Sequence, residues 1–232
     1  MSAAPDLDVL HCCNHVLCGA KPAGMATVPD ASGDESLLDR SRAWIKREFD
    51  KPGAGFLGVV HRLDRPVSGV VCFGRTSKGA ARRTASFRDR ATEKSYVAVL
   101  ERDPGFDRRD VEQWLLKDAR RNVVSVVPEA TPGARRALTE VRVLARARGR
   151  CLVGLRPVTG RPHQLRVAVS TLGAPIVGDL KYGADAPLED RSVALHALRL
   201  RVPHPTRDEV VDVRARPPAL DVWRGWDALE LD

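Results

Sequence analysis

Short apolar runs separated by turn residues dominate the pattern along the chain, and they predict a protein rich in β-strands. The predicted strands are Val9–Leu17, Val70–Phe73, Ser95–Leu100, Asn122–Val127, Leu138–Ala145, Cys151–Pro157, Val193–Val202 and Glu209–Arg214. The segment from Lys21 to Gly24 contains a proline and predicts a turn after the first strand.

Three stretches instead have the apolar spacing of an amphipathic helix. They are Ser36–Phe49, Ser77–Arg90 and the segment from Arg161 to Leu172, and a weaker helical pattern follows Pro218. Asp34 and Ser77 are the expected caps of the first two helices. Pro162 suits the first turn of the third helix, because the missing N–H of proline has no helical partner there.

These elements predict an α+β fold with a mixed or antiparallel β-sheet core and flanking helices. The sequence shows no repeat, no low-complexity linker and no domain boundary. We therefore expect one domain over residues 1–232, with its core at about residues 10–217. No apolar run approaches the roughly 18 residues of a transmembrane helix, and the first ten residues resemble no targeting signal. A cytoplasmic protein without membrane association is expected.

The charge balance adds a candidate partner. The net charge is +8, the isoelectric point is about 9.7, and only seven of the 38 basic residues are lysine. Arginine binds phosphate and stacks on bases, so nucleic acid is the simplest partner. A GC-rich genome would explain the arginine content, but it explains the net charge less well. Seven basic residues lie from Arg75 to Lys94. They are typical of a solvated helix face, although a nucleic acid could also bind them.

Three of the five cysteines lie in one short stretch with two histidines. The five residues are His11, Cys12, Cys13, His15 and Cys18. Zinc binding is one interpretation, but the chain has no CxxC pair and no second cluster at zinc-ribbon spacing. A strand with free thiols, in which cysteine acts as a small apolar residue, is favoured, so no metal is expected.

Asp64 is the first candidate for chemistry, since it lies near Arg62 and Arg65 in a loop marked by proline and glycine. Nearby positive charge lowers the pKa of a carboxyl group, so this side chain is expected to stay ionised. An ionised carboxylate can act as a nucleophile or as an electrostatic stabiliser. The alternative is a loop aspartate that pairs with its neighbours, and the charge pattern alone favours that alternative.

Two further candidates follow. Tyr96 lies at the start of a predicted strand directly after the basic segment, where packing is the alternative role. His163 and Arg166 are three residues apart in the third predicted helix and would share a face. Polar groups crowd the start of that helix, where backbone N–H groups favour an anion. The alternative is a capped amphipathic helix with a surface arginine.

Together these segments resemble the RluA family of RNA pseudouridine synthases, from about Leu10 to Pro217. The HRLDxxTSG motif of the family is matched by His61 to Gly69, and its GRxHQLR motif by Gly160 to Arg166. The other matches are Lys21-Pro-Ala-Gly24 to KPxG, Lys94-Ser-Tyr96-Val-Ala98 to KxYxA, Gly178-Asp179 with Tyr182-Gly183 to GDxxYG, and Leu195-His196-Ala197 to LHA.

The resemblance implies the pseudouridine synthase catalytic domain fold. We expect no separate N-terminal RNA-binding domain, because the match begins at about Leu10. It implies isomerisation of a uridine in a stem-loop of ribosomal or transfer RNA by a monomer that needs no cofactor and no metal. Asp64 would be the catalytic aspartate, Tyr96 would stack on the uracil, and Arg166 would pair with the aspartate. The residues implied to bind RNA are Arg62, Arg65, Lys94, Arg161, His163 and Gln164.

Two other function classes stay open at this point. One is a catalytically inactive RNA-binding protein of the same fold, which the presence of all three catalytic candidates disfavours. The other is a metal-dependent hydrolase that uses the N-terminal histidines and cysteines, or Asp179 and His196. Metal analysis of the purified protein would separate the hydrolase from the synthase.

Overall fold

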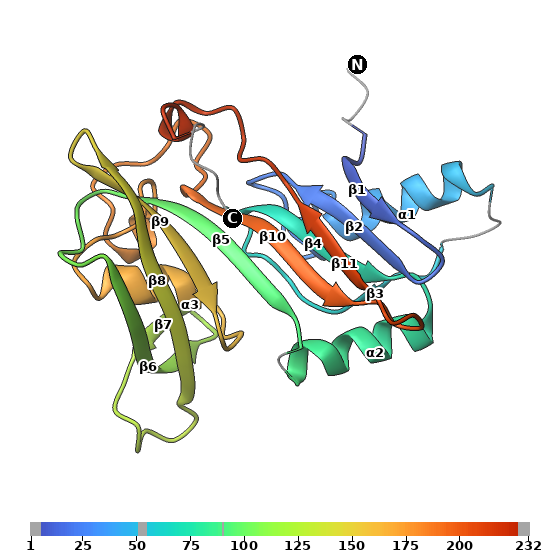
Figure 1. Ribbon diagram of the computed structural model, residues 1–232, viewed down its shortest axis with the longest axis horizontal. Helices are drawn as coiled ribbons and strands as arrows, with labels where there is room; N and C mark the ends of the chain where they lie inside the picture. Colours follow the sequence, from blue (N-terminus) through green and yellow to red (C-terminus); the bar gives the residue numbers. More distant parts are fainter. Residues whose placement is uncertain (1–5, 51–54, 90, 227–232) are drawn as a thin grey trace. The chain divides into compact units, whose positions relative to one another are not determined.

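The computed structural model (Figure 1) describes residues 6–50, 55–89 and 91–226. The chain forms two compact units, one from residues 1–93 and 197–216 and the other from residues 94–196 and 217–232. Each unit combines two stretches that are distant in the sequence, which is why no linker marks a boundary between them. No helix among the described residues is long and apolar enough to cross a membrane.

The first unit is a β-sheet with two helices. Its strands lie in the order β1, β2, β4, β10, with β11 paired to β10 and β3 paired to β4. Their bounds are Val9–Cys12 for β1, Val16–Lys21 for β2, Gly58–Val59 for β3, Ser68–Gly74 for β4, Leu195–Pro203 for β10 and Val210–Arg214 for β11. Buried residues of β2, β4, β10 and β11 form one apolar cluster. Helix α2 (Ser77–Arg88) packs against β3 and β4, as Figure 1 shows.

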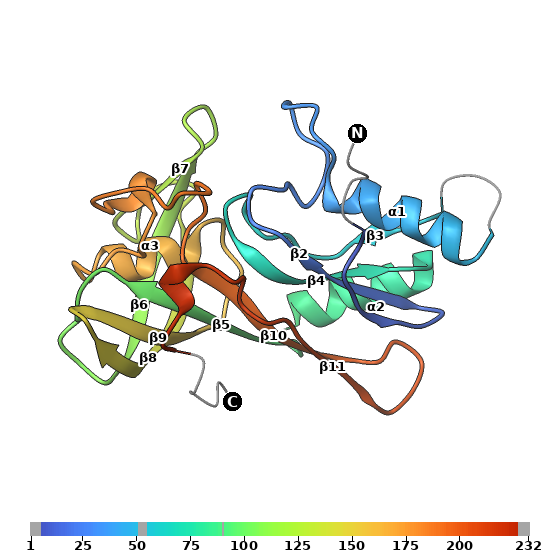
Figure 2. The same cartoon turned by 90° about the horizontal axis from the view of Figure 1, so that it is seen from above.

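The second unit is an antiparallel sheet in the order β5, β9, β8, β6, β7. The strands are Glu93–Leu100 (β5), Arg108–Asp118 (β6), Val123–Val126 (β7), Arg135–Ala147 (β8) and Arg150–Pro157 (β9). Helix α3 (Gln164–Ser170) contacts β6 to β9 (Figure 2). Leu115, Val124, Ala137 and Val167 form a small core there, and Tyr182 packs against it. Two short 3₁₀ helices, Leu180–Tyr182 and Asp221–Trp223, complete the unit.

The predicted α+β class is confirmed, and several element boundaries need correction. The first predicted strand is a hairpin, because the turn after Cys12 reverses the chain and Cys13 N–H donates to Val16 O. Strand β6 was not predicted at all. Charged residues occupy its outward positions, and only Val111 and Leu115 are buried, so its apolar alternation is weak.

The helix starts also differ from the prediction. Helix α1 (Leu37–Glu48) is capped by Ser36 rather than Asp34, because Ser36 and Asp39 form a reciprocal capping box. Helix α2 is capped by Thr76 rather than Ser77. In α3 the first helical residue is Gln164, three residues later than predicted. Two predictions fall partly outside the described residues: the end of the second helix at residue 90 and the weak helix over residues 227–232.

Candidate active site

Asp64 lies in the first unit, in the loop between β3 and β4. Hydrogen bonds from the Thr27 side chain to the main chain just before Asp64 fix this loop on one side. Thr27 Oγ1 accepts a hydrogen bond from Leu63 N (3.1 Å) and donates to Leu63 O (2.9 Å). Val67 N donates to Asp64 O (3.1 Å) and closes a turn over the aspartate. These bonds fix the main chain on which the Asp64 carboxylate is carried.

Lys21 holds the other side of the same turn. Its buried ammonium group donates to three carbonyl oxygens: Pro22 O (2.9 Å), Met25 O (2.7 Å) and Arg65 O (3.1 Å). Burial lowers the pKa of Lys21 from its usual 10.5 to about 7, against the opposing effect of the nearby Asp64 charge. The sequence indicated a turn at this lysine, but it did not place the lysine at the site.

The buried lysine makes a prediction about stability and pH. With a native pKa near 7 and an unfolded pKa of 10.5, the unfolded chain binds more protons across that window. The free energy of unfolding should therefore rise with pH from about 7 to 10, with a contribution of at most about 1.4 kcal/mol per pH unit. In Lys21→Met this contribution is absent, and urea unfolding at several pH values measures the difference in slope.

Lys46→Met is the matched control, because Lys46 is exposed on α1. It should retain the slope of the wild-type protein. If the free energy of unfolding rises equally with pH in Lys21→Met and in the wild type, Lys21 carries its full charge in the native state between about pH 7 and 10.

The side chain of Arg65 faces the polar loop at residues 30–34. Its guanidinium contacts Asp30 (2.8 Å), Asp34 (2.8 Å) and Ser32 Oγ (2.6 Å). This pairing lowers the pKa of Asp30 to about 2. Two carboxylates already pair with Arg65, and an RNA phosphate would have to compete with them. The contacts of Arg65 instead hold the loop at residues 30–34 next to the turn at Asp64.

Arg62 and His61 take different positions. Arg62 is exposed, and among the described residues it has no hydrogen bond or ion pair. His61 is half-buried, stacks on Phe87 with ring centroids 4.7 Å apart, and accepts a hydrogen bond from Cys72 N through Nε2 (2.9 Å). The imidazole therefore orients the motif, while Arg62 is available to a ligand.

In the second unit, Arg166 forms a buried ion pair with Asp179. Both bonds of the pair, Nε to Oδ2 and Nη2 to Oδ1, measure 2.7 Å, and the side chains are 5% and 1% exposed. The guanidinium carbon lies 5.0 Å from the centroid of the Tyr182 ring. Bidentate geometry fixes the guanidinium plane in a site with little water. Arg166 is therefore no surface arginine.

Tyr182 links this pair to the rest of the unit. Its hydroxyl accepts from Val124 N (3.0 Å) and lies 2.6 Å from His163 Nδ1. Ser170 Oγ donates to Tyr182 O (2.6 Å). The expectation that His163 shares a helix face with Arg166 is wrong, because His163 precedes α3 in the left-handed region (φ 50°).

Gln164 uses its whole amide inside the protein. Its Oε1 accepts from Thr159 Oγ1 (2.7 Å) and Arg161 N (3.0 Å), and its Nε2 donates to Leu138 O and Thr139 Oγ1 (both 2.9 Å). These four bonds join the turn before α3 to β8. They saturate the amide, which has two donors and two acceptor lone pairs.

Lys94 and Tyr96 lie half-buried at the start of β5, where Tyr96 pairs with Leu155 of β9. Burial lowers the pKa of Lys94, whose ammonium has no hydrogen bond or ion pair within the described ranges. The ammonium group lies close to Gly160, since a Cβ atom built on that glycine would be 3.8 Å from Lys94 Nζ. Arg161 is exposed and donates through Nε to Arg136 O (3.0 Å).

The basic segment from Arg75 to Lys94 is not one continuous cationic face. Arg83 is 1% exposed, and Arg75 donates to Cys13 O (2.7 Å). Lys78 is exposed on α2, whereas residue 90 lies outside the described residues. The segment therefore offers fewer charges to RNA than its composition suggests.

The cluster of histidines and cysteines packs in the first unit. Cys13 Sγ lies 3.6 Å from His204 Nε2, and Arg75 Nη1 donates to Cys12 Sγ (3.1 Å). In the part of the chain that the structure describes, no three His, Cys, Asp or Glu side chains are arranged to hold a metal ion. The two other ligands of the hydrolase alternative pack elsewhere, Asp179 on Arg166 and His196 against the Trp223 ring.

Each unit thus contributes one set of candidate residues. In the first, the turn at Asp64 lies beside Lys21, and in the second, Arg166, Asp179 and Tyr182 form a contact network. Sequence reasoning assigned no role in a synthase site to Lys21, Thr27, Asp179 or Tyr182, and considered Asp179 only as a metal ligand of the hydrolase alternative. The KPxG and GDxxYG matches were the available signals for all of these except Thr27.

Comparisons with known proteins identify the family of the chain. A family model described as RNA pseudouridylate synthase matches residues 15–171. The chain is 32% identical over 222 residues to the dual-specificity RNA pseudouridine synthase RluA of Haemophilus influenzae, covering 91% of this chain and 94% of that protein. It is 29% identical to ribosomal large subunit pseudouridine synthase C of Vibrio cholerae, covering 87% of this chain and 63% of that protein.

A solved structure gives the same result for the fold. Human RNA pseudouridylate synthase domain containing 1 matches with a TM-score of 0.74 and 27% identity, over 95% of this chain and 88% of that chain. The family model covers more than half of the sequence, and the motif resemblance is confirmed. The chain belongs to the RluA family of RNA pseudouridine synthases.

Proposed function

We propose that this protein isomerises a uridine in a stem-loop of ribosomal or transfer RNA, with the Asp64 carboxylate as the catalytic group. The observation that carries the proposal is the HRLD turn, in which Thr27 and Lys21 clamp the main chain on both sides of Asp64. The name of the Vibrio relative specifies ribosomal RNA, and that of the Haemophilus relative specifies dual specificity, which supports both RNA classes.

The reaction requires no redox partner. The N1–C1′ bond of uridine breaks, the uracil rotates, and a C5–C1′ bond forms. The C5 hydrogen leaves as a proton and N1 gains one, so substrate and product are isomers. Asp64 fits three routes, as nucleophile at the sugar, as nucleophile at the base, or as a base that removes a sugar proton, and each requires the ionised form. The proposed enzyme is a cytoplasmic monomer without a cofactor or metal.

The other residues receive distinct proposed roles. Tyr96 provides the ring on which the uracil stacks, and Arg166, fixed by Asp179, provides the positive charge of the site. Arg62 contacts the extruded nucleotide. Extrusion costs a few kcal/mol, and phosphate or stacking contacts from this side chain offset part of that cost. Lys94 binds RNA as a half-buried cation.

Three residues implied to bind RNA receive positioning roles here. Arg65 restrains the loop at residues 30–34, and Gln164 joins the turn before α3 to β8. His163 orients Tyr182 through its 2.6 Å contact. Arg161, whose Nη groups extend from an exposed turn, keeps its proposed contact with RNA.

The proposal is tested with unmodified ribosomal and transfer RNA transcripts that carry tritium at uracil C5. Joining the ring through C5 must expel this hydrogen, so its release reports the chemistry without knowledge of the target site. We expect release by the wild-type protein from at least one RNA class, and the responding class identifies the substrate. Tight binding of RNA without release would instead support an inactive RNA-binding protein.

A further inference from the structure

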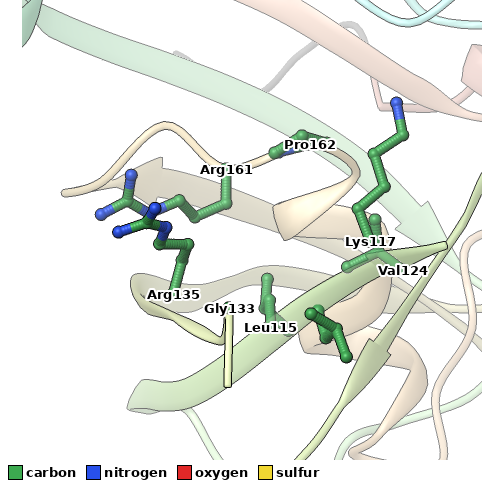
Figure 3. Close-up of a pocket in the computed structure, with 8 residues that line it drawn as sticks. Leu115, Lys117, Val124, Gly133, Arg135, Arg161 and Pro162 are labelled. Atoms are coloured by element: carbon green, nitrogen blue, oxygen red, sulfur yellow. The ribbon is translucent and has the colours of Figure 1, made fainter. Parts of the chain in front are cut away.

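The second unit contains a hollow whose lining includes Arg161 and Pro162, directly before His163. It has a volume of about 250 Å³ and is lined by Leu115, Leu116, Lys117, Val124, Gly133, Arg135, Arg161 and Pro162. Figure 3 shows the guanidinium groups of Arg135 and Arg161 extending toward one end of the hollow, with Lys117 at the other. The floor between these cations is apolar, since Leu115, Leu116 and Val124 line it.

The strand register explains why these side chains gather. Leu115 pairs with Arg135, and Lys117 pairs with Val124, so all four project from one face of the sheet. This face also carries the small core beneath α3. The cationic side chains therefore lie next to the small apolar core, on the same face of the sheet.

Within the described residues, Arg135 and Lys117 differ from the neighbouring Arg136, which points to the opposite face and has a carboxylate partner. Arg136, one residue along β8, forms a bidentate pair with Glu112 (2.5 and 2.9 Å). Across the described ranges, Arg135 and Lys117 have no ion pair or side-chain hydrogen bond, and both are exposed. The nearby Asp118 carboxylate is occupied by the N–H groups of residues 120 and 121. Three unpaired cations around an apolar floor favour an anionic ligand with a flat apolar part.

The hollow is also connected to the proposed catalytic residues. Its wall at Val124 donates its backbone N–H to the Tyr182 hydroxyl, and Tyr182 packs on Arg166. At its rim, Arg161 and Pro162 immediately precede His163. A volume of about 250 Å³ is below the usual range of about 300–1,000 Å³ for small-molecule pockets, which suits one nucleotide unit of a longer polymer.

We infer that this hollow is a subsite for a nucleotide of the substrate RNA that flanks the target uridine. Arg135, Arg161 and Lys117 bind its phosphates, and the base or ribose lies against Leu115 and Pro162. The apolar floor offers no hydrogen bond to a base edge, so the subsite reads the RNA backbone rather than the base. The inference rests on the proposed function for the identity of the RNA.

The test compares Arg135→Gln combined with Lys117→Gln against Arg136→Gln, a control that removes an arginine already neutralised by Glu112. Binding of the responding RNA is measured between about 50 and 200 mM salt. The double variant should bind about tenfold more weakly, and its plot of log affinity against log salt should be shallower by about 1–2.

The control should retain the affinity and salt dependence of the wild-type protein. Equal affinity and slope for the double variant and the control would overturn the subsite. This failure differs from a failure of the proposed function, which would appear as absence of tritium release by the wild-type protein. A shallower slope in the double variant of a protein that releases no tritium would support RNA binding at the hollow alone.

Discussion

Asp64→Asn is expected to reduce pseudouridine formation by more than about 10³-fold. The amide has nearly the shape of the carboxylate, and the turn that holds it depends on main-chain bonds from Thr27 and Lys21. The fold of the loop should therefore persist while the negative charge is lost. Tritium release under single-turnover conditions measures the chemical step, and filter binding measures the affinity for RNA, which should change by less than about threefold.

Asp208→Asn is a suitable control, because Asp208 is exposed in the loop between β10 and β11 of the same unit. It should release tritium at the wild-type rate. Substantial release by Asp64→Asn would remove the carboxylate from its proposed role, whatever the effect on binding.

Arg166→Ala is expected both to destabilise the second unit and to abolish activity. The substitution leaves Asp179 buried without the partner that now makes two 2.7 Å bonds to it. Breaking a buried pair in this way costs about 3–5 kcal/mol. Chemical unfolding measures the loss, and tritium release measures the activity.

A variant that removes both charges separates the two effects. Arg166→Met combined with Asp179→Leu should recover stability, because apolar replacements of a buried ion pair are often neutral or stabilising. It should remain inactive, since the charge that we propose for Arg166 in catalysis is gone, whereas Arg166→Lys should recover part of the activity. Activity in the doubly apolar variant would show that the pair serves the fold alone.

The sequence predicts strands well where apolar residues run together and poorly where charge interrupts them. Strand β9 (Arg150–Pro157) was predicted to within one residue, because it is apolar and mostly buried. Strand β6 carries charged residues on its exposed positions and was missed. The β1–β2 hairpin was read as one strand, since its turn at Asn14 lies inside an apolar stretch without glycine or proline.

The candidate site shows a similar division. Asp64 and Arg166 stand in specific motifs, so the resemblance identified them before any geometry was known. The clamp that Thr27 makes on Leu63 joins residues 36 positions apart, and no local pattern reports it. The buried partner of Arg166 was equally hidden, because the ion pair depends on how the 3₁₀ segment after Asp179 packs against α3.

Analysis of the RNA product tests the central claim most directly. Unmodified ribosomal and transfer RNA transcripts are incubated with the wild-type protein or with Asp64→Asn, digested to nucleosides and separated by chromatography. The account predicts that pseudouridine appears in at least one RNA class with an equal loss of uridine, and only with the wild-type protein. Pseudouridine formed equally by both proteins, or by neither on any transcript that binds tightly, would contradict it.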